Sequence, residues 1–326
     1  MGDAHDPGQL RNEIADLKQR LAAAEAKLNS SVELSPASPT PDFGDDSLRA
    51  ILLLADSALP LGSFAFSSGL ESFLAHQKQR QYRTPIPTPN SNKPATLLQA
   101  FHHFLSLSLS SLATTSLPYV LAAYRDPAAL ASLDNACDAS TPCTVARRAS
   151  TAQGRALLAV WDRSFKPHYG AAPVAAASSG DASSTDGDDG GAAAVAVAID
   201  ALAGFSTLLR TPPSAFPTPA HAFPASAHFA PLFGAVTRAL RLRASSAAYA
   251  FLFAHARTVV SAGVRASVLG PYQAQAVLAD GRLGESIRAL VREMWDVDVE
   301  DAGQCVPVLD LWVGRHEVLY SRIFNS

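Results

Sequence analysis

Ala supplies 61 and Leu 39 of the 326 residues, whereas Ile supplies only 6. This composition favours helix over sheet, because Ala and Leu are strong helix formers and Ile, which favours strands, is scarce. The 26 basic and 29 acidic residues give a formal charge of −3, so no domain-wide positive field exists to attract a phosphate backbone. Nucleic acid is therefore not an expected partner.

The cysteine count and the hydropathy pattern indicate in which cell compartment the protein is expected. Cys137, Cys143 and Cys305 are odd in number and form no C-x-x-C pair, so the sequence predicts neither a disulfide framework nor a thiolate zinc site. The chain begins with acidic rather than basic residues, and no run reaches about 18 uninterrupted apolar residues. We expect a cytoplasmic chain without a secretion signal or membrane span.

Residues 1–46 are predicted to form an extension separate from the rest of the chain. Its apolar residues alternate in steps of four and three, as in the seam of a left-handed coiled coil, at Leu10, Ile14, Leu17, Leu21, Ala24 and Leu28. Opposite charges occupy the flanking positions, at Glu13 with Lys18 and at Arg20 with Glu25. The segment spans fewer than about three hydrophobic heptads, so a parallel dimer and a marginal monomeric helix both remain open. The Pro-rich segment 35–41 is the expected linker.

Residues 47–326 are predicted to form one all-α domain of roughly ten helices. Three stretches are expected to be flexible insertions outside the core, at 80–94, 170–191 and 211–227. The first and third are rich in proline. The second is rich in Ala, Ser, Gly and Asp, and it has too little apolar bulk to offset the entropy of ordering.

The first helix of the domain is expected over 48–56. It stops at the Leu-Pro-Leu-Gly turn that contains Pro60 and Gly62, where Gly62 is expected to adopt a positive φ. We interpret this turn as structural, with a loop presented to a partner as the alternative. Ser68-Gly69-Leu-Glu71 has the S-x-x-E form of a capping box, which predicts a new helix starting at Ser68.

Four further helices follow from their periodicity. Apolar helices are expected at 95–117, at 145–165 and at 245–269, and the last is apolar almost all the way round, so we expect it to be the central helix. The segment 283–294 has the spacing of an amphipathic surface helix.

Motifs for catalysis are absent from the sequence. It contains no P-loop, no G-x-G-x-x-G, no H-E-x-x-H and no G-x-S-x-G. Ser67 or Ser68 lies near glycines, but no base or oxyanion donor accompanies it. His102 and His103 point about 100° apart on a helix, so they cannot easily bind one metal ion. His255 is interpreted as a core residue. We therefore predict no catalytic site, no intrachain metal site and no cofactor.

Three segments of the domain resemble a known family. Residues 52–71 read LLLADSALPLGSFAFSSGLE, residues 261–275 read SAGVRASVLGPYQAQ, and the chain ends with HEVLYSRIFNS at 316–326. These segments are similar, in the same order, to motifs of the urease accessory protein family UreF. Weaker similarity occurs at 147–155 and 228–234, so the resemblance covers about residues 47–326.

The resemblance implies an all-α protein that is not an enzyme. Members of this family dimerise, bind the accessory protein UreD (also called UreH) and recruit the GTPase UreG, so that nickel reaches apo-urease. The chain is thus expected to be a scaffold and a homodimer. Two alternatives are a direct nickel-binding chaperone that uses His and Cys residues, and a serine-dependent hydrolase built around Ser67 or Ser68.

The resemblance also suggests which residues contact partners. The C-terminal segment carries more large apolar residues than a free terminus would leave in water, and we expect it to bind UreD through Leu311, Trp312, His316, Leu319, Tyr320, Arg322, Ile323 and Phe324. Arg265, Gln273 and Gln275 are expected to contribute a polar contact surface. In the alternative interpretation, Arg265 interacts with a helix C-terminal dipole and at least one glutamine satisfies backbone groups near Gly270-Pro271.

Overall fold

The computed structural model describes residues 16–21, 46–83, 97–170, 191–211 and 224–325, and the chain divides into two units, 1–45 and 46–326. In the first unit, residues 16–21 are helical with Leu17 and Leu21 exposed. The rest of the predicted heptad segment and the linker lie outside the described residues. Dimerisation through this segment stays a prediction.

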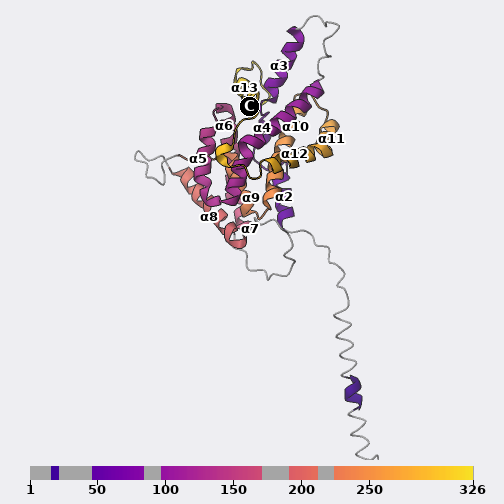
Figure 1. Cartoon of the computed structure of the whole chain (residues 1–326), viewed down its shortest axis with the longest axis vertical. Coiled ribbons are helices and arrows are strands. Elements are labelled where there is room, and N and C mark those ends of the chain that lie inside the picture. The colour runs from indigo at the N-terminus through magenta and orange to yellow at the C-terminus, as the bar shows by residue number, and fades with distance from the viewer. Residues whose placement is uncertain (1–15, 22–45, 84–96, 171–190, 212–223, 326) are drawn as a thin grey trace, which may run out of the picture. The chain divides into compact units, whose positions relative to one another are not determined.

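The second unit is built from helices, and no strand occurs in the parts of the chain that the structure describes (Figure 1). The predicted all-α class is therefore confirmed. In chain order the helices are α2 (Asp46–Ala55), α3 (Leu70–Arg83), α4 (Leu97–Arg125), α5 (Leu130–Ser140), α6 (Thr144–Val160), α7 (Lys166–Tyr169), α8 (Gly191–Arg210), α9 (Phe229–Ala239), α10 (Ala244–Arg265), α11 (Pro271–Ala279), α12 (Gly281–Glu293) and α13 (Pro307–Arg315). A 3₁₀ turn, η1 (Ser63–Ala65), precedes α3, and a π turn, η3 (Trp161–Phe165), joins α6 to α7.

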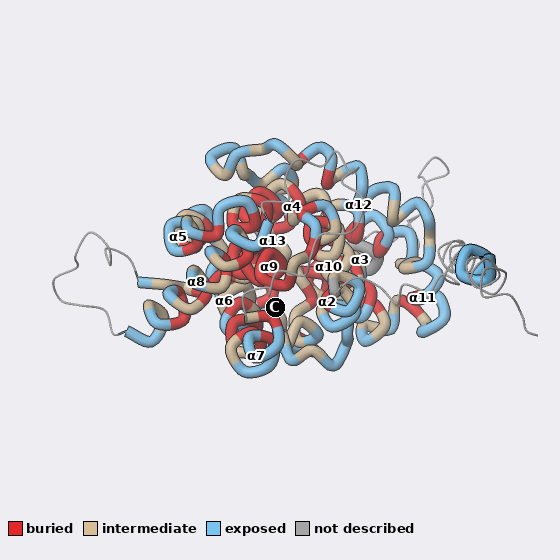
Figure 2. The backbone as a smooth tube through the Cα atoms, turned by 90° about the horizontal axis from the view of Figure 1, so that it is seen from below, coloured by how far each residue is buried: buried red, intermediate tan, exposed pale blue. Residues whose placement is uncertain are grey.

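The central helix is α9, which the sequence did not predict. Every residue from 230 to 240 is buried, and α4, α6, α8 and α10 pack around this helix (Figure 2). The prediction that 245–269 is central is wrong, because α10 ends at Arg265 and keeps partly exposed positions. Gly234 permits the tight packing of α9 on α4, since a Cβ there would lie 2.1 Å from the Val120 carbonyl oxygen.

Helix α4 continues eight residues beyond the end expected at Leu117. Pro118 lies inside it and lacks the N–H that would bond the carbonyl of Thr114. That carbonyl instead accepts a hydrogen bond from the Gly303 N–H, at 3.1 Å. A distant loop thus satisfies the group that the proline leaves open, which explains why the helix does not end there.

A buried carboxylate fixes the start of α9. The Asp134 side chain on α5 accepts hydrogen bonds from the backbone N–H groups of Ser226, Ala227 and His228, at 2.7, 3.2 and 2.6 Å. Residues 224–227, which were expected to belong to a flexible insertion, are therefore part of the fold. Helix α6 passes close to this segment, because a Cβ on Gly154 would lie 2.0 Å from the Ala227 carbonyl oxygen.

The His228 side chain completes this buried network. Its Nε2 donates to Asp138 Oδ1 at 3.0 Å, and this hydrogen bond is the main reason that the pKa of Asp138 is lowered from its ordinary value. Its Nδ1 accepts from the Ser150 hydroxyl at 3.0 Å, and Ser150 Oγ in turn accepts from the Phe229 N–H at 3.1 Å. The network joins α5, α6 and α9.

Other expectations have mixed outcomes. The amphipathic surface helix is confirmed, because Ile287 and Val291 of α12 are buried while Glu285 and Arg288 are exposed. Residues 80–83 of the first expected insertion are helical and end α3. The remainder of that insertion and most of the other two, 171–190 and 212–223, lie outside the described residues.

Three helices are long and apolar enough to cross a membrane by length and composition alone, contrary to the expectation from uninterrupted runs. They are α4, α8 and α10, whose most apolar windows are 61%, 28% and 50% buried inside the fold. More than half of the most apolar window of α4 and half of that of α10 are thus used in packing the helices together. That the chain has no membrane partner stays a prediction.

Candidate partner-binding site

The start of α3 departs from the predicted capping box. Ser68 and Gly69 both have positive φ, 52° and 87°, and α3 begins at Leu70. Ser68 therefore lacks the extended backbone that an N-cap residue uses. The Glu71 N–H donates to Ser67 Oγ at 3.4 Å, and the Glu71 carboxylate turns toward the C-terminal segment. The predicted Ser68–Glu71 box is wrong.

The Glu71 carboxylate binds the C-terminal segment at three points. Its oxygens accept hydrogen bonds from the backbone N–H groups of Ile323 and Phe324, at 2.7 and 3.3 Å. His316 Nε2 donates to Glu71 Oε2 at 2.9 Å, and the His316 side chain is fully buried. Hydrogen bonds to a charged acceptor are stronger than neutral ones. Glu71 therefore holds the chain terminus against the start of α3.

Aromatic packing reinforces this attachment. The Trp312 ring on α13 lies 4.7 Å from the ring of Phe73 and 6.0 Å from that of Phe104, measured between centroids. Gly69 admits α13 closely, since a Cβ at that residue would lie 3.1 Å from the Val313 side chain. Trp312 thus anchors the C-terminal segment from within the body.

We call the contact of the C-terminal segment with the start of α3 and with η1 the junction. Arg265 joins it from the last turn of α10. Its guanidinium carbon lies 4.3 Å from the centroid of the buried Phe324 ring. Partial burial lowers the pKa of this guanidinium, which still stays protonated at neutral pH. The residue after Phe324, Asn325, donates its N–H to the Ala65 carbonyl in η1 at 2.7 Å. The cation–π contact and the terminal hydrogen bond fix the end of the chain.

An ion cluster at the surface continues the junction onto α6. Glu317 pairs with Arg148 through one carboxylate oxygen and with Arg322 through the other, the latter at 3.2 Å. These arginines, Arg148 foremost, lower the pKa of Glu317. The junction therefore gathers residues from α3, α6, α10, α13 and the C-terminus.

The predicted partner contacts divide into an inner and an outer group. Trp312, His316 and Phe324 face the body, and Leu319 is half-buried. The outer group is exposed and consists of Leu311 (63% exposed), Tyr320 (fully exposed), Arg322 and Ile323 (63%). Its apolar members, together with Val318 (75%) and the nearby Phe64 of η1 (67%), which the sequence did not predict as contacts, are called the tail face. The apolar periodicity of a sequence cannot separate these groups, because the division depends on where Glu71 and Arg265 hold the segment.

The polar residues expected to form a contact surface in segment 261–275 lie in different places. Arg265 joins the junction, whereas Gln273 Oε1 accepts a hydrogen bond from the Gly270 N–H at 3.0 Å, at the start of α11. The alternative in which a glutamine satisfies backbone near Gly270-Pro271 is thus confirmed for Gln273. Gln275 is exposed, and its contact role stays a prediction.

The turn between α2 and α3 has the predicted backbone. Gly62 adopts φ 68° at the start of η1, and Pro60 is exposed. A Cβ at Gly62 would meet no atom within 4 Å. The need for glycine there is conformational and does not arise from packing.

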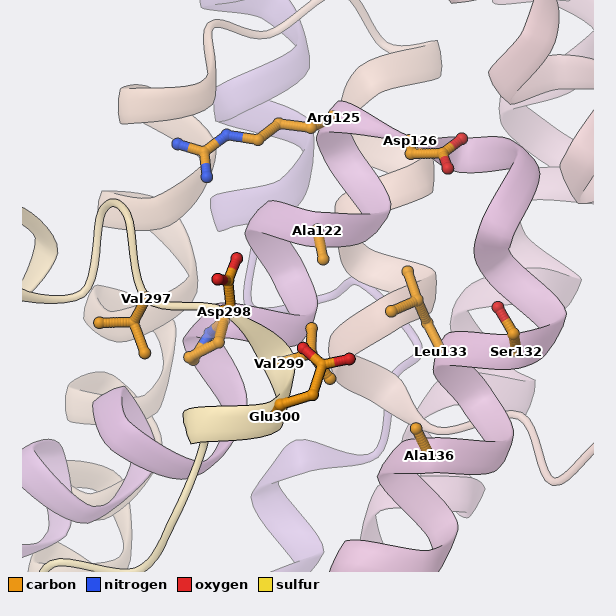
Figure 3. A pocket seen from close by; sticks show the side chains of 11 residues that line it. Ala122, Arg125, Asp126, Ser132, Leu133, Ala136, Val297, Asp298, Val299 and Glu300 are labelled. Carbon is orange, nitrogen blue, oxygen red and sulfur yellow. The ribbon is translucent and has the colours of Figure 1, made fainter.

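Other candidate sites are weaker. No group of three or more His, Cys, Asp or Glu side chains that could hold a metal ion occurs within the described ranges. A shallow pocket of about 410 Å³ lies between α4, α5 and residues 297–300, and Figure 3 shows Asp298 and Glu300 along it. None of the residues predicted to bind partners lines this pocket. Ser67 is fully buried, so it is not placed to attack a substrate from solvent.

Comparison with known proteins identifies the family. The UreF family model matches residues 98–282, more than half of the chain. The chain belongs to the UreF family. An uncharacterized UreF-like urease accessory protein of Schizosaccharomyces pombe is 33% identical, over 84% of this chain and 95% of the relative. Urease accessory protein F of Oryza sativa is 27% identical over 83% and 82%, and urease accessory protein 6 of Cryptococcus neoformans is 26% identical over 86% and 97%.

The structure relates the family assignment to the junction. Of the three segments that carry the resemblance, only 261–275 lies within the matched range, while 52–71 and 316–326 lie outside it. The structure nevertheless brings all three together, through the contacts of Glu71 and Arg265 with the C-terminal segment. In this UreF-family chain the three segments therefore meet at one junction.

Proposed function

We propose that the chain is a non-enzymatic scaffold for urease maturation in the cytoplasm. It binds a UreD-type protein (UreH) through the tail face and, in that complex, recruits the GTPase UreG, so that nickel reaches apo-urease. The chain is a homodimer in this assembly. The observation that carries the proposal is a C-terminal segment whose inner side is fixed by Glu71 while its outer side exposes large apolar residues. The names of the relatives support a role in urease maturation.

The physical basis is preorganisation. Ordering a loop on binding opposes association, and a segment that is already fixed avoids that loss of free energy. Tyrosine is common among the residues that dominate interface energies. Tyr320 is fully exposed and lies in the sequence between the exposed residues Val318 and Ile323. The segment that Glu71 fixes thus offers a partner protein an apolar surface that is already in place.

The test is copurification of the chain with UreD- and UreG-type partners, with and without GTP and magnesium. We expect a ternary complex, and we expect deletion of Tyr320–Ser326 to abolish retention of the UreD-type protein. Because this deletion also removes the groups that Glu71 binds, a surface variant, Tyr320→Ala with Ile323→Ala, is needed beside it. Full retention of the UreD-type protein by the surface variant would contradict the proposal.

Two further measurements separate the proposal from its alternatives. Equilibrium dialysis of the isolated chain against nickel should show no tight stoichiometric binding, whereas such binding would favour a nickel-binding chaperone. Arg265→Ala should weaken assembly without a comparable fall in the melting temperature. If it lowers the melting temperature and leaves assembly intact, Arg265 acts only within the fold, through Phe324 and the C-terminal dipole of α10.

A further inference from the structure

Four exposed cations lie along the continuous helix formed by α6, η3 and α7. Arg148, Arg155, Arg163 and Lys166 are all exposed, and we call these four residues the basic stripe. With a rise of about 1.5 Å per residue, Arg148 and Arg163 are on the order of 20 Å apart along the helix. The stripe is therefore long enough to lie along the surface of another protein.

The π turn helps to align the three arginines of the stripe, whereas it turns Lys166 away from their line, on which Lys166 would lie in an uninterrupted α-helix. Arg148 and Arg155 are seven residues apart and lie within about 20° of each other around an α-helix. In an uninterrupted α-helix Arg163 would be displaced by roughly 60°, but the wider turn at Trp161–Phe165 rotates less per residue and returns it toward the same side. The same turn directs Asp162 toward α8, where its carboxylate binds Ser206 and Arg210. π turns of this kind occur frequently at functional sites.

Among the described residues, the stripe has too few acidic neighbours to neutralise it. The side chains of Arg155, Arg163 and Lys166 form no hydrogen bond or ion pair with any residue that the structure describes. The two nearby carboxylates are already used, Asp162 by Arg210 and Glu317 by Arg148 and Arg322. Since the whole chain has a formal charge of −3, this side concentrates positive charge on an otherwise acidic protein. Such a concentration attracts an anionic surface over a distance of about 10 Å.

The chemistry of the stripe favours a protein carrying carboxylates. Three of its four cations are arginines, whose planar guanidinium matches a carboxylate through two hydrogen bonds. A membrane-surface helix would also need large apolar residues to insert, and no exposed large apolar residue occurs in α6, η3 or α7. Binding to a nucleic acid backbone commonly uses more cations than these four, together with aromatic side chains for single strands.

We infer that the basic stripe docks an acidic face of the same protein that the tail face binds. Arg148 links the two surfaces, because it pairs with Glu317 two residues before Leu319 in the C-terminal segment. The occupant is therefore a partner with an apolar patch flanked by aspartate and glutamate side chains. This inference rests on the proposed function for the identity of that partner. The salt dependence of the association rate reports the charged contact separately from the apolar contact of the tail face.

The experiment compares three full-length chains with the purified UreD-type partner as the probe. The stripe variant is Arg155→Glu, Arg163→Glu and Lys166→Glu, which spares the Glu317 cluster. The control variant is Lys78→Glu, Arg243→Glu and Arg292→Glu, which makes the same change in charge at exposed residues of α3 and α12 and at the residue before α10. A neutral version of the stripe variant, with Gln at the three positions, is tested if the glutamates lower the melting temperature.

Affinity is measured by biolayer interferometry from low to high salt. We expect the stripe variant to lose about tenfold in association rate at low salt, an effect that shrinks as salt rises, because charge steers encounter. The control variant should stay within about twofold of the wild type. Equal binding by the stripe and control variants would overturn the inference and leave the proposed function standing.

The remaining outcomes are also decisive. If the wild-type chain does not bind the UreD-type protein, the proposed function fails, and the same chains are then measured against duplex DNA and against vesicles that contain phosphatidylserine. Stripe-dependent binding to either would identify a different class of occupant and overturn the inference. Absence of binding to all three probes would overturn it as well.

Discussion

Two carboxylates in this molecule perform the same task in different settings. Asp134 accepts three backbone N–H groups at residues 226–228, and Glu71 accepts two at residues 323–324. A fully buried histidine accompanies each, His228 near Asp134 and His316 bound to Glu71. In both places one side chain fixes a segment that is distant in sequence.

The difference lies in what the fixed segment does next. The segment held by Asp134 enters α9, the most buried helix, so its other side is covered by α4, α6 and α8. The segment held by Glu71 has the tail face on its other side, in solvent. The same hydrogen-bonding arrangement therefore serves the core at residues 226–228 and presents a surface at residues 323–324.

Asp134→Ala should have the largest effect, because it leaves three backbone N–H groups without their acceptor. Each unsatisfied buried group costs about 1–3 kcal/mol, so we expect a loss of more than about 3 kcal/mol, measured by urea denaturation. Asp126→Ala is the matched control, since Asp126 caps the exposed turn before α5 through a single hydrogen bond to the Ala128 N–H; it should cost about 1 kcal/mol. A similar loss in both variants would show that burial does not distinguish them.

His255 adds a third side-chain contact to the comparison, and here the partner is a hydroxyl group instead of a carboxylate. Its Nε2 lies 2.7 Å from Ser108 Oγ, and burial lowers its pKa to about 4, from 6.5. Between pH 6.5 and about pH 4 this histidine is therefore protonated in the unfolded chain but not in the folded chain. The free energy of unfolding should fall as pH falls through this window, by about 3 kcal/mol at most. In His255→Gln the fall measured by urea denaturation between pH 7 and pH 4.5 should be smaller. Parallel pH profiles would contradict this.

Glu71→Ala should cost about 1–3 kcal/mol, because it frees two backbone N–H groups and the His316 side chain near the surface. Hydrogen exchange should quicken at the amides of Ile323 and Phe324, while the amides of α9 stay protected. Binding to the UreD-type partner should weaken as well. Protection that is lost in both regions together would mean that the C-terminal segment is not a separately held unit.

Gly62→Val should cost about 1–2 kcal/mol, because φ at this residue is 68° and a β-branched side chain is strained there. Gly62→Asn should cost less, since asparagine tolerates the left-handed region. The measurement is the melting temperature of both variants. An unchanged melting temperature for Gly62→Val together with lost recruitment of UreG would instead make the turn a partner contact.

The helical class and several helices could be predicted from the sequence because their signals are local. The spacing of Ile287 and Val291 identifies α12, and the Pro-Gly turn before Gly62 ends the segment that contains α2. Two of the misses are non-local. α4 passes Pro118 because the distant Gly303 bonds the free carbonyl of Thr114, and α9 is central because Asp134 holds its start.

The candidate site shows the same limit. The three similar segments could be found in sequence, but Glu71 was assigned to a capping box because the S-x-x-E pattern is local. Its actual hydrogen bonds reach Ile323 and Phe324, more than 250 residues away. No spacing rule could predict that contact, or separate the buried Phe324 from the exposed Ile323 beside it.

Tyr320→Ala should have the smallest effect on stability and therefore tests the outer side of the comparison alone. The Tyr320 side chain is fully exposed, so its truncation should change the free energy of unfolding by less than about 0.5 kcal/mol. If the tail face is a binding surface, the same change should weaken affinity for the UreD-type partner by about 2 kcal/mol, or roughly thirtyfold. Phe324→Ala is the matched control from the inner side, and it should lower stability by about 3 kcal/mol because that ring is buried against Arg265. The two variants should thus separate folding from binding, measured by urea denaturation and interferometry on the same samples. Equal binding by Tyr320→Ala and the wild type would show that holding the segment in place, rather than presenting its outer residues, is the whole purpose of the Glu71 contacts.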